Sequence, residues 1–285
     1  MEPHHLFVTD LDGTLLRSDE SLSDFAAATL NAAIARGLAF TYCTSRSFFA
    51  AKRLCSRIDF RLPAIVSNGA FAVDARSGEI LHATVLDRAL ADVVLQEAGR
   101  QGWSPFVCGF LGSREVVAYR PPLNPGQADW VARRQRRGDH RLTPVARLAV
   151  PDVVSELLFL EDEAGSLALE QWLQAAFEDS VGVTRMAETY FPGCFSVEVA
   201  NPAANKAGAL RWLAGRLDLR PDHLTVFGDN LNDLPMFRVA GQRIAVANAQ
   251  APVRQAADLV IPSNDEDGVA HYMARLPAPA LPAER

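Results

Sequence analysis

The alternation of short apolar runs with amphipathic segments near the N-terminus is the feature that most constrains how this chain folds. Apolar runs at residues 6–9, 38–43 and 64–67 are separated by segments of helical periodicity at about 23–37 and 47–57. Strands that alternate with helices pair in parallel, because each helix returns the chain to the same end of the sheet. The pattern therefore predicts an α/β fold with a doubly wound, Rossmann-like parallel sheet.

The same alternation returns in the last third of the chain. The expected helices and strands follow one another as a helix at 205–217, a strand at 224–227, a helix at about 232–239, a strand at 244–246, a short helix near Val253 and a strand at 259–261. Because both ends of the chain show one pattern, we expect them to form a single core.

Residues 84–200 follow a different pattern, in which strand-like runs outnumber helices. The amphipathic stretches lie near 88–100, 126–137 and 166–177, and the strand-like runs include 115–119, 155–160, 181–185 and 195–199. This mixture predicts a separate α+β domain inserted into the first. We therefore expect a core of residues 1–83 and 201–285, interrupted by an inserted cap of residues 84–200.

Composition limits the class of protein and its partners. Hydrophobic residues make up 49% of the chain and the net charge is −6, which fits a soluble globular protein and argues against nucleic acid as a partner. No apolar run approaches the roughly 20 residues that span a bilayer, so no membrane partner is expected. The widely spaced Cys43, Cys55, Cys108 and Cys194 are expected to be reduced thiols, and the expected location is cytoplasmic.

Polar residues follow the predicted core strands at the point where each strand ends. In an open parallel sheet, ligands bind beyond these carboxyl ends. The strand-end residues are Asp10 and Asp12, then Thr44, Ser45 and Arg46, then Asn68 and Gly69, then Asp229, Asn232 and Asp233. Lys206 begins the helix before the strand at 224–227. We expect all of them to face one rim of the sheet.

Four of these residues are carboxylates, which would repel one another if they lay close together without a counter-charge. A hard divalent cation relieves that repulsion, and oxygen-only ligands suit Mg²⁺ better than zinc. Such a site can also receive a phosphate, whose charge the cation and Lys206 offset and whose oxygens Thr44 can hydrogen-bond. Asp10, directly after the strand, is the expected nucleophile. Asp12 is the expected acid for the leaving oxygen and the base that then activates water.

Four segments, in this order along the chain, resemble the motifs of the haloacid dehalogenase-like superfamily. They are Asp10-Leu11-Asp12-Gly13-Thr14-Leu15, Thr44, Lys206 and Gly228-Asp229-x-x-Asn232-Asp233. Ser67-Asn68-Gly69-Ala70, the long insert and Asn248-Ala249 resemble the Cof-type branch of sugar-phosphate phosphatases. The resemblance covers both parts of the core, whereas the cap is recognised by its position alone.

The resemblance implies a role for each motif residue. Mg²⁺ would be held by the Asp10 carboxylate, the backbone carbonyl of Asp12 and the Asp229 carboxylate, and Asp233 would contact metal-bound water. The expected substrate-binding residues are Leu11, Thr44, Ser45, Lys206 and Asn232. Ser45 stands where such proteins usually have glycine, so its side chain either narrows the phosphate pocket or donates one more hydrogen bond.

These roles predict a phosphatase that hydrolyses a small phosphorylated metabolite, a sugar phosphate or related phosphomonoester, through a phosphoaspartate on Asp10. A phosphomutase has the same catalytic set but passes the phosphoryl group to a second substrate hydroxyl. A non-enzymatic receiver domain is disfavoured, since it takes its acidic pair and its phospho-acceptor from different strands. A dehalogenase would need neither the magnesium cluster nor Asp12. The substrate and the oligomeric state stay open.

Overall fold

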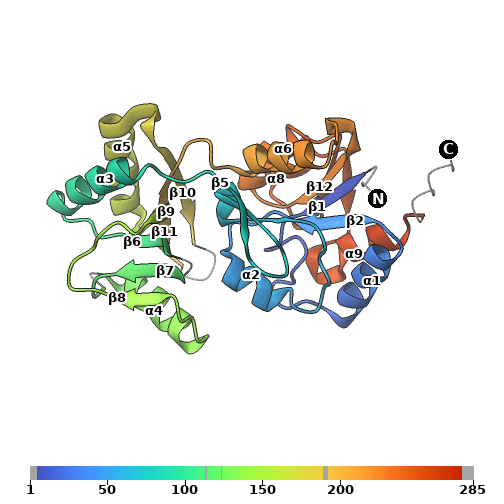
Figure 1. Cartoon of the computed structure of the whole chain (residues 1–285), viewed down its shortest axis with the longest axis horizontal. Helices are drawn as coiled ribbons and strands as arrows, with labels where there is room; N and C mark the ends of the chain where they lie inside the picture. Colours follow the sequence, from blue (N-terminus) through green and yellow to red (C-terminus); the bar gives the residue numbers. More distant parts are fainter. Residues whose placement is uncertain (1–4, 113, 123, 189–191, 278–285) are drawn as a thin grey trace. The chain divides into compact units, whose positions relative to one another are not determined.

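The computed structural model describes residues 5–112, 114–122, 124–188 and 192–277. The chain divides into two compact units, one formed by residues 1–83 with 205–285 and the other by residues 84–204. In Figure 1 the first unit carries the blue and the orange-to-red segments, and the second unit carries the green and yellow ones. The second unit ends at Ala204, whereas the sequence pattern placed the end of the insert at residue 200.

The first unit is built on a parallel sheet of five strands in the order β14-β13-β12-β1-β2. The strands are β1 (Leu6–Thr9), β2 (Ala39–Tyr42), β12 (Leu224–Gly228), β13 (Gln242–Val246) and β14 (Leu259–Ile261). Every residue of β1 and β12 is buried, as expected for parallel strands covered on both faces. Because β1 pairs directly with β12, the two ends of the chain share one sheet, and the predicted α/β fold is confirmed.

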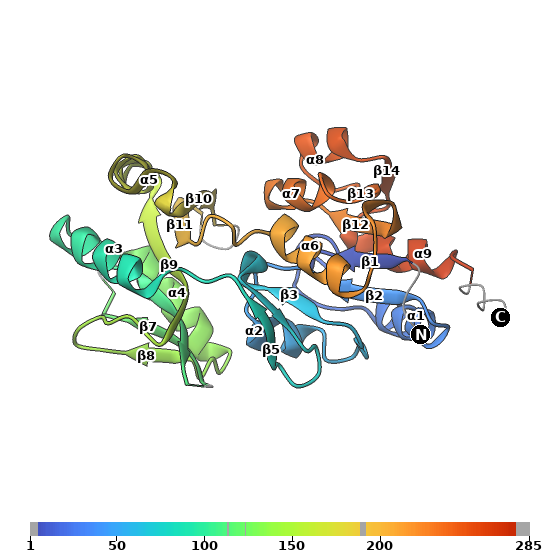
Figure 2. The ribbon, with the colours of Figure 1, turned by 45° about the horizontal axis from the view of Figure 1, so that its top comes forward.

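The two longest helices of the first unit begin where the sequence provides capping residues. Ser23 and Asn205 each accept a backbone N–H through the side chain, at the starts of α1 and α6. The helices are α1 (Asp24–Ala35), α2 (Phe48–Leu54), α6 (Lys206–Arg216), α7 (Leu234–Phe237), α8 (Ala251–Ala256) and α9 (Gly268–Ala274), with 3-10 turns η3 (Pro221–His223), η4 (Leu231–Asp233) and η5 (Asn264–Glu266). α1 packs beside α9, and α7 packs beside both α6 and α8 (Figure 2).

The third apolar run forms a strand outside the five-stranded sheet. It belongs to an antiparallel sheet of β3 (Ala64–Val66), β4 (Phe71–Val73) and β5 (Ile80–Ala83). An isolated parallel bridge between Cys43 and Ile65 links this sheet to the end of β2. The chain reverses at the 3-10 turn η1 (Ser67–Gly69), where all three residues have positive φ. The run at 64–67 forms a strand as predicted and meets the end of β2 in parallel at one bridge, but its regular pairing is with β4, which the left-handed turn at η1 places antiparallel beside it.

The second unit contains a six-stranded sheet in the order β10-β11-β9-β6-β7-β8, in which β7 and β8 are parallel and the other neighbours antiparallel. The strands are β6 (Phe106–Leu111), β7 (Arg114–Tyr119), β8 (Leu142–Pro144), β9 (Val153–Asp162), β10 (Gly182–Ala187) and β11 (Cys194–Ala200). The helices are α3 (Arg88–Arg100), α4 (Pro125–Arg136) and α5 (Glu163–Phe177), followed by the 3-10 turn η2 (Glu178–Ser180). Strands outnumber helices as predicted, although β6 and β8 were not expected.

Alternate residues of these strands face two hydrophobic cores. Val107, Leu157 and Phe159 belong to the core that includes residues of α3 and α5, whereas Phe106 and Leu158 belong to the one that includes residues of α4. The alternation follows from the period of two along a strand. Helices therefore cover both faces of this sheet, at least in part.

Two expectations from composition concern the whole chain. All four cysteines are free thiols, and Cys43, Cys55 and Cys194 are buried, which agrees with the predicted reduced state. Among the described residues, every helix is too short or too polar to cross a lipid bilayer.

Candidate active site

The loop after β1 folds back tightly on itself. The carbonyl of Leu11 accepts hydrogen bonds from the backbone N–H groups of Thr14 and Leu16. Gly13 has a φ of +74°, and a Cβ atom at this position would lie 2.5 Å from Asp229 Oδ2. Any side chain here would force the two loops apart. The glycine thus lets the first motif lie directly against the loop that follows β12.

A buried lysine joins three segments that are distant in sequence. Lys206, the first residue of α6, is fully buried, and its Nζ lies 2.6 Å from Asp10 Oδ1 and 2.6 Å from Asp233 Oδ1. The side chain of Asn205 accepts the N–H of Gly208 and so fixes where α6 begins. An ammonium group without water needs such partners. The ends of β1 and β12 and the start of α6 therefore meet at one ion cluster.

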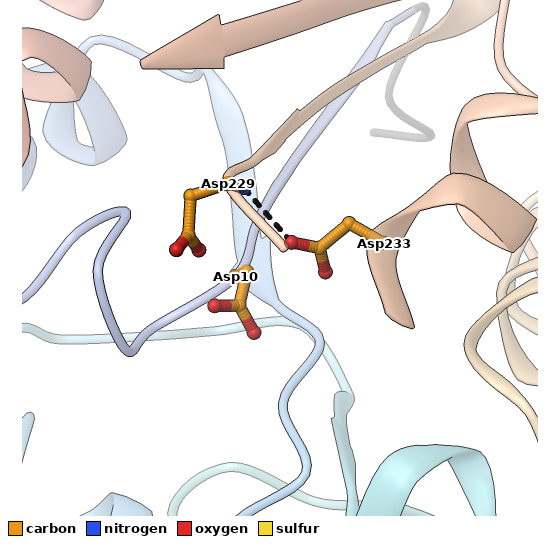
Figure 3. A group of neighbouring side chains, drawn as sticks. All are labelled: Asp10, Asp229 and Asp233. Carbon is orange, nitrogen blue, oxygen red and sulfur yellow. Dashed lines mark hydrogen bonds between the residues drawn. The ribbon is translucent and has the colours of Figure 1, made fainter. Parts of the chain in front are cut away.

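Asp233 is held through both of its oxygens. Its Oδ2 accepts the backbone N–H groups of Asp229, at 2.9 Å, and Asn230, at 3.1 Å, while its Oδ1 accepts Lys206. Gly228 permits this arrangement, since a Cβ atom there would lie 2.6 Å from the Cβ of Asp233. Figure 3 shows Asp233 turned toward the backbone of Asp229. The carboxylate of Asp233 is thus engaged in holding the loop together.

Asp10 and Asp229 are each engaged through one oxygen. Asp10 Oδ1 accepts Lys206, and Asp229 Oδ1 accepts the Thr14 hydroxyl at 2.8 Å. In the described part of the chain, no hydrogen bond reaches Asp10 Oδ2 or Asp229 Oδ2. One oxygen each from Asp10, Asp229 and Asp233 lies within 4.8 Å of the others, and Figure 3 shows the three side chains gathered around one space. Asp10 and Asp229 therefore keep an oxygen available for a ligand.

The electrostatics of this cluster favour a bound cation. Burial raises the pKa of Asp10 well above its ordinary value, and the carboxylates of Asp233 and Asp229 raise it further against the opposing effect of Lys206. Burial and the charge of Asp233 raise the pKa of Asp229 to about 7. The burial of Lys206 would lower its pKa, but Asp10 and Asp233 outweigh burial and raise it. Three carboxylates thus face one ammonium group, and an oxygen-only donor set with excess negative charge fits Mg²⁺.

The side chain of Asp12 lies apart from the three gathered carboxylates. Arg46 binds both of its oxygens, with Nε 2.6 Å from Oδ2 and Nη2 2.5 Å from Oδ1. The side chain of Asp12 is 37% exposed, whereas Asp10 is buried. Two carboxylates of one loop therefore have different surroundings, and a nucleophile and an acid/base need such a difference.

The other predicted substrate-binding residues differ in exposure. Thr44 is fully buried and its hydroxyl accepts the N–H of Arg46 at 3.1 Å. Ser45 is exposed, and Asn232 is half-buried in η4. The side chain of Leu11 is fully buried, so that only its backbone can reach a ligand. Within the described ranges, the side chains of these four residues make no hydrogen bond to the carboxylate cluster.

Sequence reasoning did not assign roles to three residues that hold these loops. Arg46 binds Asp12, Glu20 binds Arg46 at 3.2 Å, and the side chain of Asn248 donates to the carbonyl of Gly13 at 2.7 Å. Arg46 carried a signal, because it is a cation in a strand-end loop opposite the predicted carboxylates. Glu20 carried none, since its contact with Arg46 spans 26 positions.

The sequence matches the family of haloacid dehalogenase-like hydrolases over residues 7–273. The match spans the parallel-sheet unit and the inserted unit alike. The chain therefore belongs to this family, as its four motifs predicted.

Named relatives and solved structures resemble nearly the whole chain. The 5-amino-6-(5-phospho-D-ribitylamino)uracil phosphatase YwtE of Bacillus subtilis is 26% identical over 284 residues, which cover 94% of this chain and 96% of the relative. The HMP-PP phosphatase of Cronobacter sakazakii is 27% identical over 272 residues, covering 93% and 92%. A haloacid dehalogenase-like hydrolase from Bacteroides thetaiotaomicron shares the fold with a TM-score of 0.81 at 24% identity, covering 95% of this chain and 98% of that one.

Proposed function

We propose that this protein is a Mg²⁺-dependent phosphatase that hydrolyses a small phosphorylated metabolite, a sugar phosphate or related phosphomonoester, through a phosphoaspartate on Asp10. The observation that carries the proposal is the state of Asp10, which is buried, held through Oδ1 by Lys206 and left with Oδ2 available. Membership of the hydrolase family and two relatives named as phosphatases support the same class of reaction.

Mg²⁺ would be held by the Asp10 oxygen that does not attack phosphorus, the available oxygen of Asp229 and the backbone carbonyl of Asp12. Asp233 fits an outer position better, because both of its oxygens already accept hydrogen bonds. Bound Mg²⁺ would neutralise part of the charge of the phosphoryl group and of the carboxylates around it. The raised pKa of Asp229 supports this assignment, since a carboxylate that resists ionisation in the bare protein gains most from a cation.

The chemistry of the reaction then falls to the two aspartates of the first loop. Asp10 Oδ2 attacks the phosphorus atom while the bond from phosphorus to the leaving oxygen breaks, and Asp12 gives that oxygen its proton. The products of this step are the dephosphorylated alcohol and a phosphoaspartate on Asp10. Asp12, now ionised, takes a proton from water as the water attacks phosphorus. Inorganic phosphate leaves, and Asp10 and Asp12 regain their starting states.

Binding of the phosphoryl oxygens is assigned to Thr44, Lys206, Asn232, the backbone N–H of Leu11 and the Ser45 hydroxyl. Thr44 is well prepared for this role, because its oxygen already accepts the N–H of Arg46 and its own proton remains to be donated. The exposed Ser45 would add one further donor. Selection of the rest of the substrate is proposed to lie in the second unit, and the protein is proposed to act in the cytoplasm without a nucleic-acid or membrane partner.

The test is release of inorganic phosphate from a panel of phosphorylated metabolites, with Mg²⁺ and with EDTA. Wild type is compared with Asp10→Asn and with Asp129→Asn, which changes an exposed aspartate of α4. Magnesium-dependent release that disappears in Asp10→Asn and survives in Asp129→Asn is the expected result. Release that persists in Asp10→Asn would contradict the mechanism. Transfer of the phosphoryl group between substrate hydroxyls without free phosphate would make the protein a phosphomutase.

A further inference from the structure

The guanidinium group of Arg46 clamps Asp12 and is itself held by a second carboxylate. Its Nε and Nη2 bind the two oxygens of Asp12 at 2.6 and 2.5 Å, and Nη2 also lies 3.2 Å from Glu20 Oε1. A planar guanidinium that binds both oxygens of a carboxylate fixes its orientation as well as its distance. Nη2 therefore contacts the carboxylates of Asp12 and Glu20 at the same time.

The backbone of Arg46 is fixed on both sides. Its N–H donates to the Thr44 hydroxyl at 3.1 Å, and its carbonyl accepts the N–H of Ser67 at 2.8 Å. Ser67 has a φ of +49° and begins the left-handed turn that reverses the chain after β3. Backbone contacts with two loops of the site therefore fix the point from which the Arg46 side chain extends.

Glu20 is placed by an unusual backbone conformation. Its side chain is only 8% exposed, and its φ of +66° is in the region that residues with a side chain seldom adopt. Burying a carboxylate is costly unless it meets a cation, and Arg46 is that cation. Burial alone would lower the pKa of Arg46, but Asp12 and Glu20 raise it, so the guanidinium stays charged. Glu20 is therefore a buried carboxylate held in an unfavourable backbone conformation beside Arg46. Such conformations tend to occur where a residue has a functional role.

We propose that Arg46 is the positioning residue of Asp12, and that Glu20 holds Arg46 in the orientation in which it does so. The inference rests on the proposed function, in which Asp12 transfers the proton. The Asp12 side chain is 37% exposed. Without the contact with Arg46, it is free to rotate away from the position needed to transfer the proton.

A positioning role for Arg46 can be distinguished from a purely structural one. If Arg46 positions the acid, the loss of kcat/KM on removing it should depend on the leaving group. A sugar or alkyl alcohol leaves as an unstable anion unless it is protonated, whereas p-nitrophenolate leaves readily without help. The comparison uses kcat/KM, because this quantity covers the steps up to the phosphoaspartate and excludes the later attack of water, which both substrates share. A residue that orients the acid therefore matters for the alkyl ester and hardly for p-nitrophenyl phosphate.

The experiment measures kcat/KM of the full chain for p-nitrophenyl phosphate and for the best alkyl phosphomonoester of the panel. We expect Arg46→Ala to lower kcat/KM for the alkyl ester by about 10- to 100-fold and for p-nitrophenyl phosphate by less than about threefold, because general acid catalysis contributes roughly a hundredfold or more. Asp12→Asn should show the same pattern with a larger loss. The Arg46→Ala/Asp12→Asn double variant should lose little beyond Asp12→Asn, since Arg46 acts through Asp12.

Arg17→Ala is the matched control. Arg17 also binds both oxygens of an aspartate in the first unit, with Nη2 2.7 Å and Nε 3.3 Å from the Asp267 carboxylate, and its loss should leave the ratio between the two substrates unchanged. Glu20→Gln provides a second, milder test if Arg46→Ala fails to fold. It should lower the alkyl-ester kcat/KM by about threefold to tenfold with the same selectivity, the size expected for one charge-assisted contact.

An equal loss for both substrates in Arg46→Ala, or additive losses in the double variant, would overturn the role of Arg46. An equal loss for both substrates in Glu20→Gln would overturn the proposal that Glu20 holds Arg46 in its orientation. These failures differ from failure of the proposed function, in which Asp10→Asn would keep its activity or wild type would release no phosphate from either ester.

Discussion

Each unit of the molecule buries a cation between two carboxylates, and the two arrangements differ in their balance of charge. In the first unit, Lys206 contacts Asp10 and Asp233. In the second, Arg141 is 3% exposed and binds Glu115 at 2.6 Å and Asp139 at 2.7 Å. Both satisfy the rule that a buried charge needs partners. The two clusters differ in the groups around them. The Arg141 cluster stabilises its unit, whereas the Lys206 cluster has carboxylate oxygens available for a ligand.

The ion pairs around Arg141 in the second unit are matched in number. Arg134 joins this cluster by contacting Asp139 at 3.2 Å and by lying over the ring of Trp130, so two guanidinium groups face two carboxylates. The partly buried Glu156, whose pKa burial raises, also interacts with both guanidinium groups. Burial would raise the pKa of Asp139, but Arg141 and Arg134 outweigh burial and lower it.

In the first unit the cation is outnumbered. The Asp229 carboxylate lies beside the two that Lys206 contacts, and the pKa of Asp10 is raised and not lowered. What distinguishes the candidate site is that oxygens of three carboxylates lie within 4.8 Å of one another, with Asp10 and Asp229 each keeping one oxygen unshared among the described residues.

The largest effect should come from removing the two cations in turn. Lys206→Met leaves Asp10 and Asp233 buried without a counter-charge, and it removes the group that fixes Asp10. We expect kcat to fall at least about a hundredfold and the free energy of unfolding to fall by about 3–5 kcal/mol. Phosphate release and denaturant unfolding measure the two effects.

Arg141→Met is the control for this prediction. It also breaks a buried ion network, so a similar loss of stability is expected, but the activity of the folded protein should stay within about twofold of wild type. A comparable fall in kcat for Arg141→Met would show that the Arg141 cluster takes part in catalysis, against the distinction drawn here.

A smaller effect should follow from closing the space between the two loops of the site. Gly13→Ala places a Cβ atom 2.5 Å from Asp229 Oδ2 at a φ of +74°. Asp229 must then move, and we expect the affinity for Mg²⁺ to fall by about tenfold to a hundredfold, as when the partners of a metal ligand are disturbed. Calorimetric titration with MgCl₂ measures this change.

Gly102→Ala supplies the comparison in the second unit. Gly102 has a φ of +90°, but nothing lies within 4 Å of an added Cβ atom. Both variants therefore carry backbone strain, and only Gly13→Ala meets the site. Equal Mg²⁺ affinity in the two variants would show that Asp229 does not hold the metal.

Much of the site was predictable because each part of it is local in sequence. Asp10 directly follows β1, Lys206 directly follows the N-cap Asn205, and Asp229 and Asp233 lie in one turn after β12. The parallel pairing of β1 with β12 then brings these segments together. Strand-end position and capping chemistry are sequence signals, so the motifs could be placed before their contacts were known.

The reversal after β3 could not be predicted in the same way. Ser67 and Asn68 adopt positive φ because their N–H groups bind the carbonyls of Arg46 and Thr44, which belong to another loop. Asn68-Gly69 is a turn signal in its own right, but nothing in the local sequence requires Ser67 to be left-handed as well. Such a turn depends on tertiary contacts, and so does the placement of Glu20 against Arg46.

The smallest effect that we predict is a pH dependence of stability with opposite sign in the two clusters. The folded protein raises the pKa of Asp229 from 3.8 to about 7, so it binds this proton more tightly than the unfolded chain does. The stability of the Mg²⁺-free protein should therefore fall as the pH rises from about 4 to about 7 and then level off. Asp139 has a lowered pKa, so its contribution is present above its ordinary value and is lost as the pH falls.

Melting temperatures in EDTA at pH 5 and pH 8 test this difference, with Asp229→Asn and Asp139→Asn as the paired variants. Asp229→Asn should lose less stability than wild type between pH 5 and pH 8. Its neutral amide carries no charge at pH 8, whereas the Asp229 carboxylate is then ionised in a site that disfavours this charge without Mg²⁺. Asp139→Asn should retain the wild-type fall between pH 5 and pH 8, because Asp139 is ionised at both. Saturating Mg²⁺ should raise the wild-type melting temperature more at pH 8 than at pH 5, since binding requires the ionised carboxylates. An equal rise at both pH values would mean that Asp229 is already ionised at pH 5 in the bare protein, and the raised pKa assigned to it would be wrong.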